Sequence, residues 1–386
     1  MYLDTAATTP VRREVLEAMW PYLAGGEQGV FGNPSSRHEQ GRRAAAALEE
    51  ARERIAAHLG CRPGELVLTS GGTESDNLAV RGIVLASPRG RHVVVSAVEH
   101  DAVREAAEAL RRLHGAAVDV VGVDARGLVF PEDVRGMLRA DTALVSIQHG
   151  GNEVGGVQPI ARIAEVARAA GVPVHTDAVQ SAGWLPVGLD ALGVDALTIA
   201  GHKLGAPRGV GALAVRRGTP LEPLLYGGGQ QRGRRSGTED VAGAVGLATA
   251  LDLAVADRTR ADGLARARDA LVARVRTAVP GAILTGPEPG PDRLPNHASF
   301  CFPGTNGETV LLELDRAGVS CSSGSACAAG DDEPSPVLLA LGIDPAVART
   351  AVRLTLPVGF TEHDAAAVAD RIRDAVARVA GLASRI

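Results

Sequence analysis

The chain has 386 residues, 45% of them hydrophobic and 22% charged, which is typical of a globular protein with room for two or three domains. Its formal net charge of -5 at pH 7 provides no basic surface for nucleic acid, so we expect no direct nucleic-acid contact. The N-terminal MYLDTAATTP lacks the regions of a signal peptide, and no run of roughly 18 apolar residues could span a membrane. We therefore expect a cytoplasmic protein without membrane contact.

Short apolar runs alternate with helical patterns through the first part of the chain. Two apolar stripes have helical spacing, at Ala44, Leu48, Ala51, Ile55 and Leu59, and at Val103, Ala106, Ala107 and Leu110. Strands are predicted at 65–70, 92–98, 116–123, 143–148, 172–178, 196–201 and 209–215. Strands separated by helices predict an α/β fold with a mostly parallel sheet flanked by helices. In such sheets, ligands bind at the carboxyl ends of the strands.

The pattern changes after Thr238. One long helix rich in Ala, Leu and Arg is predicted over about 239–279, and mixed short strands and helices follow. The last helix is predicted to be amphipathic, with apolar positions at Val368, Ile372, Val376 and Val379. We therefore expect a large domain over 13–255 and a smaller α+β domain formed by 1–12 and 256–386.

Lysine is almost absent from the sequence. Of the 40 Lys and Arg residues, Lys203 alone is a lysine. Arginine can replace lysine on a solvated surface, but only a neutral primary amine can form a Schiff base with an aldehyde. Lys203 is therefore a candidate for covalent chemistry. The alternative is that one lysine was retained by chance on a solvated loop.

Polar residues follow three of the predicted strands. The TSGGTESDN segment places two glycines and Thr73, the expected helix N-cap, where helix N–H groups could bind a phosphate. Asp177 and Gln180 follow the VPVHTDA strand, and Asp177 could pair with a protonated ring nitrogen. His202 and Lys203 follow the ALTIAG strand. These strand ends supply the three attachments that pyridoxal 5′-phosphate (PLP) requires: a phosphate cradle, a ring-nitrogen partner and an amine.

Two further polar residues fit the same ligand. His100 lies between a predicted strand and a helix, where it could stack on the ring or instead cap the helix. Asn152, in the Gly-rich GGNEVGG turn, could bind the phenolic oxygen of the ring.

Cys327 lies in a Ser-, Gly- and Ala-rich segment, SSGSACAAGDDEP, which is typical of an exposed loop where a thiol is reactive. The other cysteines, Cys61, Cys301 and Cys321, are predicted to be structural. Four cysteines without a Cys-x-x-Cys pair predict reduced thiols and no disulfide framework. No metal site is expected.

Ordered motifs run along nearly the full length of the chain: YLDTAATTP, FGNPSS, TSGGTESDN, VEH, GNEVG, HTDAVQS, AGHK, GGGQQRGRRSGT, SSGSAC, EPS and AVRLTL. Together they resemble the PLP-dependent cysteine desulfurases of the NifS/IscS type, within the class V aminotransferase group. The resemblance implies the PLP-dependent transferase fold of type I, PLP as the cofactor and a homodimer. It also implies conversion of L-cysteine to L-alanine, with the sulfur carried as a persulfide and then passed to an acceptor protein.

The resemblance gives each matching residue a role. Cys327 would be the nucleophile, Lys203 would hold PLP in Schiff-base linkage and move the substrate proton, and His100 would complete the catalytic set. Cofactor contacts are implied for Gly72, Thr73, His100, Asn152, Asp177, Gln180, Ala200, His202, Lys203 and, from a second subunit, Thr238. Substrate contacts are implied for Arg353, which would bind the carboxylate, and for Asn33 and Asn152. The Cys327 loop, about 321–333, would belong to the small domain.

The sequence departs from that family pattern in places. Ala200 stands where many relatives have a serine that donates to the phosphate, and Gly151 stands where they usually have asparagine. Asp331 and Asp332 follow Cys327 closely, and like charge would raise the pKa of its thiol. The length of the segment from Cys327 onward resembles the long-loop subgroup, which implies free cysteine as the substrate and transfer to a partner protein.

Other functions stay open at this point. A selenocysteine lyase or another class V enzyme would keep Lys203 and Asp177 but would not need Cys327. A non-enzymatic scaffold for sulfur-carrier proteins would bind no PLP. The destination of the sulfur is also open, between iron–sulfur assembly and DNA phosphorothioation. The Arg-rich composition and the departures from the family pattern make DNA phosphorothioation a serious alternative.

Overall fold

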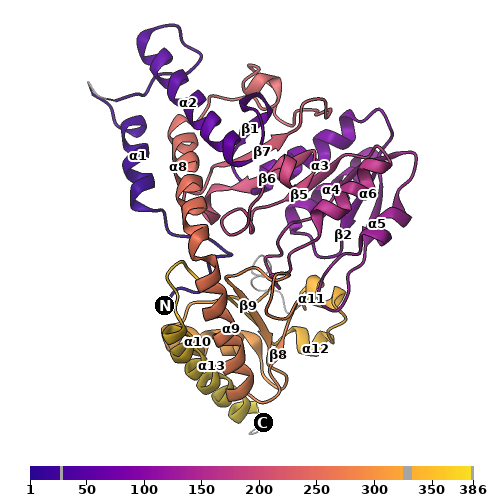
Figure 1. Ribbon diagram of the computed structural model, residues 1–386, viewed down its shortest axis with the longest axis vertical. Coiled ribbons are helices and arrows are strands. Elements are labelled where there is room, and N and C mark those ends of the chain that lie inside the picture. The colour runs from indigo at the N-terminus through magenta and orange to yellow at the C-terminus, as the bar shows by residue number, and fades with distance from the viewer. Residues whose placement is uncertain (27–28, 325–332, 384–386) are drawn as a thin grey trace.

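The computed structural model describes residues 1–26, 29–324 and 333–383 (Figure 1). Its larger part is built around a seven-stranded sheet and its smaller part around a three-stranded sheet. Within these ranges, no helix is long and apolar enough to cross a membrane.

The larger sheet has the strand order β1-β7-β6-β5-β4-β2-β3. Its strands are β1 (Leu66–Thr69), β2 (His92–Ser96), β3 (Ala117–Val121), β4 (Thr142–Ser146), β5 (Val174–Asp177), β6 (Ala196–Ala200) and β7 (Gly211–Val215). β7 is antiparallel to both of its neighbours, and the other pairs are parallel. Residues 201–210, between β6 and β7, are too few for the crossover that a parallel pair needs. The mostly parallel sheet is confirmed, and each strand lies where the sequence predicts it.

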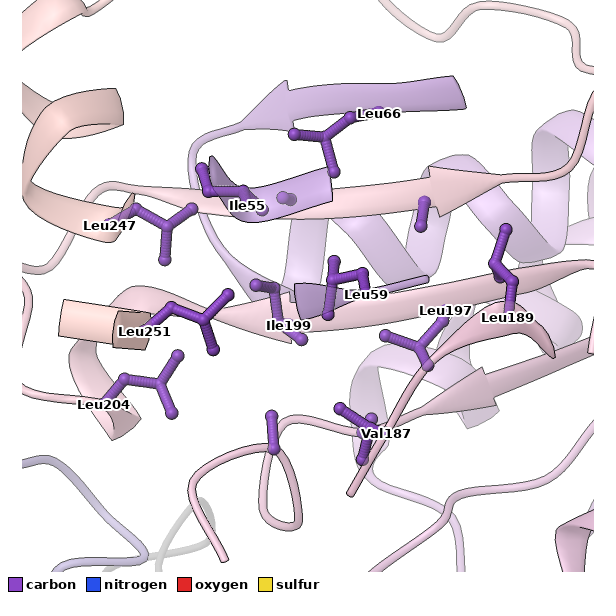
Figure 2. Packing of buried hydrophobic residues seen from close by; sticks show 14 of the residues in the cluster. Ile55, Leu59, Leu66, Val187, Leu189, Leu197, Ile199, Leu204, Leu247 and Leu251 are labelled. Atoms are coloured by element: carbon purple, nitrogen blue, oxygen red, sulfur yellow. The ribbon is translucent and has the colours of Figure 1, made fainter. Parts of the chain in front are cut away.

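Two layers of helices cover the faces of this sheet, because successive side chains of each strand point in opposite directions. Leu197 and Ile199 of β6 pack in one hydrophobic cluster and Ala196 in another. The first layer comprises α1 (Arg13–Leu23), α2 (Glu39–His58), α5 (Pro131–Met137), α6 (Ile160–Ala169), α7 (Leu189–Leu192) and α8 (Val241–Asp257). The second comprises α3 (Gly72–Ala86) and α4 (Asp101–His114). Figure 2 shows Leu59, the C-cap of α2, and Leu251 of α8 beside Ile199 of β6.

The smaller part packs helices on an antiparallel sheet with the order β10-β9-β8. Its strands are β8 (Ile283–Leu284), β9 (His297–Cys301) and β10 (Ala351–Thr355). Its helices are α9 (Ala261–Ala278), α10 (Gly307–Arg316), α11 (Pro336–Ala340), α12 (Pro345–Ala348) and α13 (Glu362–Ala383). The predicted amphipathic face of α13 is confirmed, since all four of its apolar positions are buried: Val368, Ile372, Val376 and Val379.

The single long helix predicted over 239–279 is wrong. α8 ends at Asp257, a 3-10 turn occupies Arg258–Arg260, and α9 begins at Ala261. α8 packs on the larger sheet, whereas α9 packs with α13 in the smaller part. Helical spacing continues across the turn, so the break follows from the separation of two hydrophobic cores and has no local sequence signal.

The predicted domain division stays a proposal, which the hydrophobic clusters support. One cluster contains buried residues from Val15 to Ala254. A second contains Leu3 together with residues from Leu264 to Val379. Tyr2 and Asp4 also form β-bridges to Ser320 and Thr355. The N-terminal segment thus packs with the C-terminal part of the chain.

Candidate active site

A cavity of about 280 Å³ lies at the edge where the parallel strands of the larger sheet end. It is lined by Ala7, Gly72, Thr73, Asp76, His100, Gln148, Gly150, Asn152, Asp177, Val179, Gln180, Ala200, His202 and Lys203. All the residues predicted to contact a cofactor are among them, except Thr238. Segments far apart in sequence therefore converge on one cavity, as the strand-end argument predicts.

Lys203 ends a 3-10 turn, Gly201–Lys203, that directly follows β6. Its Nζ donates to the backbone carbonyl of Ala7 at 2.8 Å and also to that of Ala6. A Cβ at Gly201 would lie 2.8 Å from Val210 Cγ1, so this tight turn needs glycine. The strand end and the N-terminal segment together hold the amine at the cavity wall.

Asp177 is the last residue of β5 and is 7% exposed. Its Oδ1 accepts a hydrogen bond from Val179 N–H at 2.8 Å. Burial raises the pKa of Asp177, while the charges of His100 and Lys203 oppose this effect. A buried carboxylate needs a cationic partner, and a protonated ring nitrogen would be one.

Asp76, on α3, lines the same cavity and is 1% exposed. Its Oδ1 is buried and has no hydrogen-bond partner in the described part of the chain. Burial and then the charge of Asp177 raise the pKa of Asp76 well above its ordinary value. The unpartnered oxygen marks this wall as one that can accept a polar group of a ligand.

His175 supports the wall from within the sheet and is fully buried. Its Nδ1 hydrogen-bonds with Ser146 Oγ at 2.8 Å and its Nε2 with Thr198 Oγ1 at 3.0 Å. Burial lowers the pKa of His175 to about 3, so the imidazole is neutral. Thr198 in turn hydrogen-bonds the Asp76 side chain. His175 is therefore linked to Asp76 through Thr198 and brings no positive charge to it.

The N-terminus of α3 faces the cavity through Gly72 and Thr73. The prediction that Thr73 caps this helix is wrong. The N-cap is Gly71, with φ of 151°, so the helix begins earlier than predicted. No side chain hydrogen-bonds the first N–H groups of α3 as a cap. A Cβ at Gly72 would lie 3.0 Å from Val179 Cγ2, so glycine keeps this space open. The uncapped N–H groups are suited to a phosphate.

Two histidines line the cavity. His202 Nδ1 hydrogen-bonds with Thr8 Oγ1 at 3.1 Å, and burial lowers the pKa of His202 to about 4. His202 is therefore neutral. His100 Nδ1 accepts from Ala102 N–H at 3.1 Å, which confirms that His100 caps α4. Its stacking on a ring stays a prediction for the same side chain.

Asn152 and Gln180 also line the cavity. Gln180 Nε2 donates to the Ala6 carbonyl at 3.0 Å, the carbonyl that Lys203 also contacts. The carbonyl of Asn152 accepts from His297 Nε2 and Arg353 Nη1, each at 3.1 Å. Binding of a phenolic oxygen by Asn152 stays a prediction, as does the cofactor contact of Gln180.

Three predicted contacts lie outside the cavity lining. Arg353, on β10, is 1% exposed, and its Nη2 pairs with Asp4 Oδ1 at 2.9 Å. Asn33 is exposed, and its Oδ1 accepts from Ser35 N–H at 2.9 Å. Thr238 is exposed as well. Substrate binding by Arg353 and Asn33, and a contact by Thr238 across subunits, stay predictions.

The predicted nucleophile, Cys327, lies outside the described residues, as do Asp331 and Asp332. Gly324 and Glu333 are the described residues that flank them.

Five lining residues were not predicted from the sequence: Ala7, Asp76, Gln148, Gly150 and Val179. Gln148 and Gly150 follow β4, so the rule that placed Asp177 at a strand end could have found them. Asp76 lies in TESDN, where an acidic residue is typical of a helix start. Ala7 reaches the cavity through a contact with Lys203, 196 residues away in sequence, and has no local signal.

The residues present fit PLP. The uncapped N–H groups of α3 suit the phosphate, and Lys203 supplies the amine. Asp177, with the unpartnered oxygen of Asp76 beside it, suits a protonated ring nitrogen. The three attachments lie around one cavity, as the cofactor requires.

The three cysteines in the described ranges have poorly reactive thiols. Burial raises the pKa of Cys61 to about 12, that of Cys301 to about 11 and that of Cys321 to about 12. The thiolate is the nucleophilic form, so each of these cysteines is almost inert near neutral pH.

We expect iodoacetamide at about pH 8 to alkylate Cys61, Cys301 and Cys321 at least roughly 100-fold more slowly than free cysteine. Rates at all three should rise as the pH rises, because the thiolate fraction increases. Peptide mass mapping over time measures each rate, and urea-unfolded protein is the control. Reaction of any of the three at the rate of free cysteine in the folded protein would contradict this assignment.

Comparison with known proteins agrees with this geometry. The class-V aminotransferase family matches residues 1–368. An IscS-like cysteine desulfurase of Mycobacterium tuberculosis is 45% identical over 384 residues, covering 98% of this chain and 96% of the relative. A solved NifS-like protein superposes with a TM-score of 0.89 at 34% identity, covering 98% of this chain and 99% of that one. DndA from Streptomyces lividans superposes with a TM-score of 0.74 at 34% identity, covering 92% of this chain and 99% of that one. The predicted fold and cofactor are thereby confirmed, and the chain belongs to the class-V aminotransferase family of PLP-dependent proteins.

Proposed function

We infer that this protein is a PLP-dependent cysteine desulfurase. The Cβ–S bond of L-cysteine breaks, a bond forms between that sulfur and Sγ of Cys327, and Cβ gains a proton to give L-alanine. One observation carries the proposal: the single lysine of the chain lines the same cavity as Asp177 and the uncapped N-terminus of α3. The relative named as a cysteine desulfurase supports cysteine as the substrate.

Lys203 and Asp177 have complementary roles in this reaction. When bound, PLP supplies an electron-withdrawing ring that stabilises negative charge at the substrate Cα. Lys203 holds the cofactor and, once its amine is free, moves the proton at Cα. Its contacts with the Ala6 and Ala7 carbonyls keep the amine at the cavity wall. Asp177, as a carboxylate, keeps the ring nitrogen protonated.

The remaining lining residues bind and orient the cofactor. The N–H groups of α3, with Thr73 and His202, bind the phosphate. His202, which lines the cavity, would contribute a hydrogen bond to the phosphate. His100 would stack on the ring, because the hydrogen bond from Ala102 N–H fixes its imidazole at the cavity.

Two of the departures from the family pattern, Ala200 and Gly151, have a structural counterpart. Ala200 has its methyl 3.4 Å from the position of a Cβ on Gly72 and offers no hydroxyl to a phosphate. Phosphate binding then depends more on the α3 N–H groups, on His202 and on Thr238 from a second subunit. A Cβ at Gly151 would lie 3.3 Å from Gln148 Nε2, so the Gln148 amide fills space that an asparagine at 151 would need.

A homodimer is part of the proposal. Thr238 is exposed in the single chain and would complete the phosphate site of a second copy. Large hydrophobic side chains are exposed near Thr238 in the sequence and also on α1. Tyr226 is 73% exposed and Trp20 is 69% exposed. Exposed apolar residues of this size favour burial in an interface.

The sulfur then passes from Cys327 to an acceptor protein. Iron–sulfur assembly is the first proposed destination, because a relative carries the name IscS-like. DNA phosphorothioation is the second, favoured by the likeness to DndA. Direct contact with DNA is not proposed, since Arg235 pairs with Glu74 and Arg232 and Arg234 donate to backbone carbonyls. A cytoplasmic location stays a prediction.

Alanine formation from L-cysteine separates this function from its rivals. A selenocysteine lyase or another class-V enzyme would require a different substrate and no persulfide on Cys327. A non-enzymatic scaffold would be colourless, without the yellow of lysine-bound PLP. Incubation of the pure protein with L-cysteine, followed by measurement of alanine and mass mapping of the persulfide, tests the proposal.

Cys327→Ser should bind PLP and cysteine as the parent does but form no persulfide and release no sulfide, because the hydroxyl cannot accept the sulfur. Sulfide assay and intact mass measure the outcome. Cys61→Ser is the matched control and should keep full activity, since Cys61 is not among the residues that line the cavity. Full turnover by the Cys327→Ser variant would remove the assigned nucleophile.

Asp177→Asn should weaken PLP binding and slow alanine formation by roughly 100-fold or more, because a buried ion pair loses one partner. Titration with PLP and initial-rate assays measure the two effects. Asp370→Asn is the control, since Asp370 is exposed on α13. Parental affinity and rate in the Asp177→Asn variant would contradict its role opposite the ring nitrogen.

A further inference from the structure

Glu153 contacts both ends of the segment that carries Cys327. Its Oε2 accepts a hydrogen bond from Ser335 Oγ at 2.5 Å. The same oxygen lies 3.0 Å from the position that a Cβ on Gly324 would occupy. Gly324 and Ser335 are described residues on either side of 325–332, so one carboxylate lies close to the chain before this segment and hydrogen-bonds the chain after it.

Gly324 is buried and is held from a second side. Its carbonyl accepts from Arg353 Nη1 at 3.5 Å. Ser322, two residues earlier, forms a β-bridge with Arg353. The Ser322 hydroxyl also donates to Asp4 Oδ2 at 2.7 Å. A side chain at 324 would press against Glu153, so glycine permits this close approach.

Ser335 is anchored as firmly at the other end. It is 4% exposed and is the N-cap of α11, where its Oγ accepts from Leu338 N–H at 3.2 Å. Val337 and Leu338 of α11 pack in one hydrophobic cluster with Val154. The hydrogen bond to Glu153 therefore links a packed helix start to the turn that borders the cavity.

The turn that presents Glu153 is itself fixed. Asn152, the preceding residue, lines the cavity, and its carbonyl accepts from Arg353 and His297. Gly155, two residues on, has φ of 73°, and a Cβ there would lie 2.6 Å from His297 Cγ. Glu153 is thus a rigid point adjacent to the cavity wall.

The short stretch of chain between Gly324 and Cys327 connects the anchoring by Glu153 to the nucleophile. Cys327 is three residues from Gly324, and a fully extended chain spans about 3.6 Å per residue, so its Cα stays within about 11 Å of Gly324. Anchoring Gly324 therefore limits where the thiol can be, whatever path the chain takes.

We propose that Glu153 is a positioning residue that fixes both ends of the segment bearing Cys327 against the cavity wall. It acts as the hydrogen-bond acceptor for Ser335 and as the surface on which Gly324 rests. The proposal rests on the proposed function in one respect only, that Cys327 receives the sulfur. The anchoring itself can be measured without turnover.

Amide hydrogen exchange of the PLP-loaded enzyme tests the anchoring. Glu153→Ala removes the oxygen that both ends contact, so exchange at 321–324 and 333–341 should rise about tenfold. Glu153→Gln keeps an acceptor oxygen for Ser335 and should remain close to the parent. Glu165→Ala, at an exposed position of α6, is the control and should change neither segment.

Single-turnover persulfide formation tests the consequence for Cys327. In Glu153→Ala the rate should fall between about 10- and 100-fold, because the thiol is less well placed. PLP content and the cysteine concentration for half-maximal rate should stay unchanged, and Glu153→Gln should restore the rate. If Glu153→Ala lost PLP or cysteine binding while its rate of persulfide formation stayed parental, a positioning role would be contradicted.

Gly324→Ala gives a second measurement that leaves Glu153 in place. Its methyl would lie 3.0 Å from Glu153 Oε2, so the carboxylate and the chain must move apart, and exchange at 321–324 should rise here too. Parental exchange in both Glu153→Ala and Gly324→Ala would overturn the inference, as would a Glu153→Gln variant as impaired as Glu153→Ala. If exchange rises as expected but the parent forms no persulfide, the proposed function fails while the anchoring stands.

Discussion

The pairing of β5 with β6 is the constraint on which the site depends. Asp177 lies opposite Thr198, so β5 ends while β6 continues to Ala200. The carboxylate and Lys203 therefore enter the same cavity from adjacent strand ends. A shift by one residue would turn every side chain of β5 to the other face, and the acid would leave the cavity. The sheet register thus brings together an acid and an amine that lie in different parts of the sequence.

Buried acidic groups give the cavity its preference for a cationic ring. Burial raises the pKa of Asp76 and of Asp177, and it raises the pKa of the neighbouring Glu99 to about 8. His175, whose Nε2 lies 3.7 Å from Asp76 Oδ1, is neutral and supplies no positive charge. A ligand with a protonated ring nitrogen would allow Asp177 to ionise, which connects the electrostatics of the wall to the chemistry of PLP.

Features with a local pattern were predictable from the sequence. The strands follow from apolar runs, and Asp177 and Lys203 follow from strand ends combined with the scarcity of lysine. The contact of Ala7 with Lys203 and the pair between Asp4 and Arg353 were not predictable, because each joins the N-terminal segment to distant parts of the chain. The break between α8 and α9 depends on two separate cores, which helical spacing does not reveal. The cap of α3 was misplaced because a glycine conformation decides it.

The central claim is that the ε-amino group of Lys203 bonds covalently to PLP. Borohydride reduces such a bond irreversibly, and peptide mass mapping then locates the adduct. Because Lys203 is the single lysine, the amino terminus is the other primary amine of the chain. We expect loss of the yellow colour and one adduct, on the peptide that contains Lys203. Protein saturated with PLP that yields no adduct there, or yields it on Met1, would contradict the account.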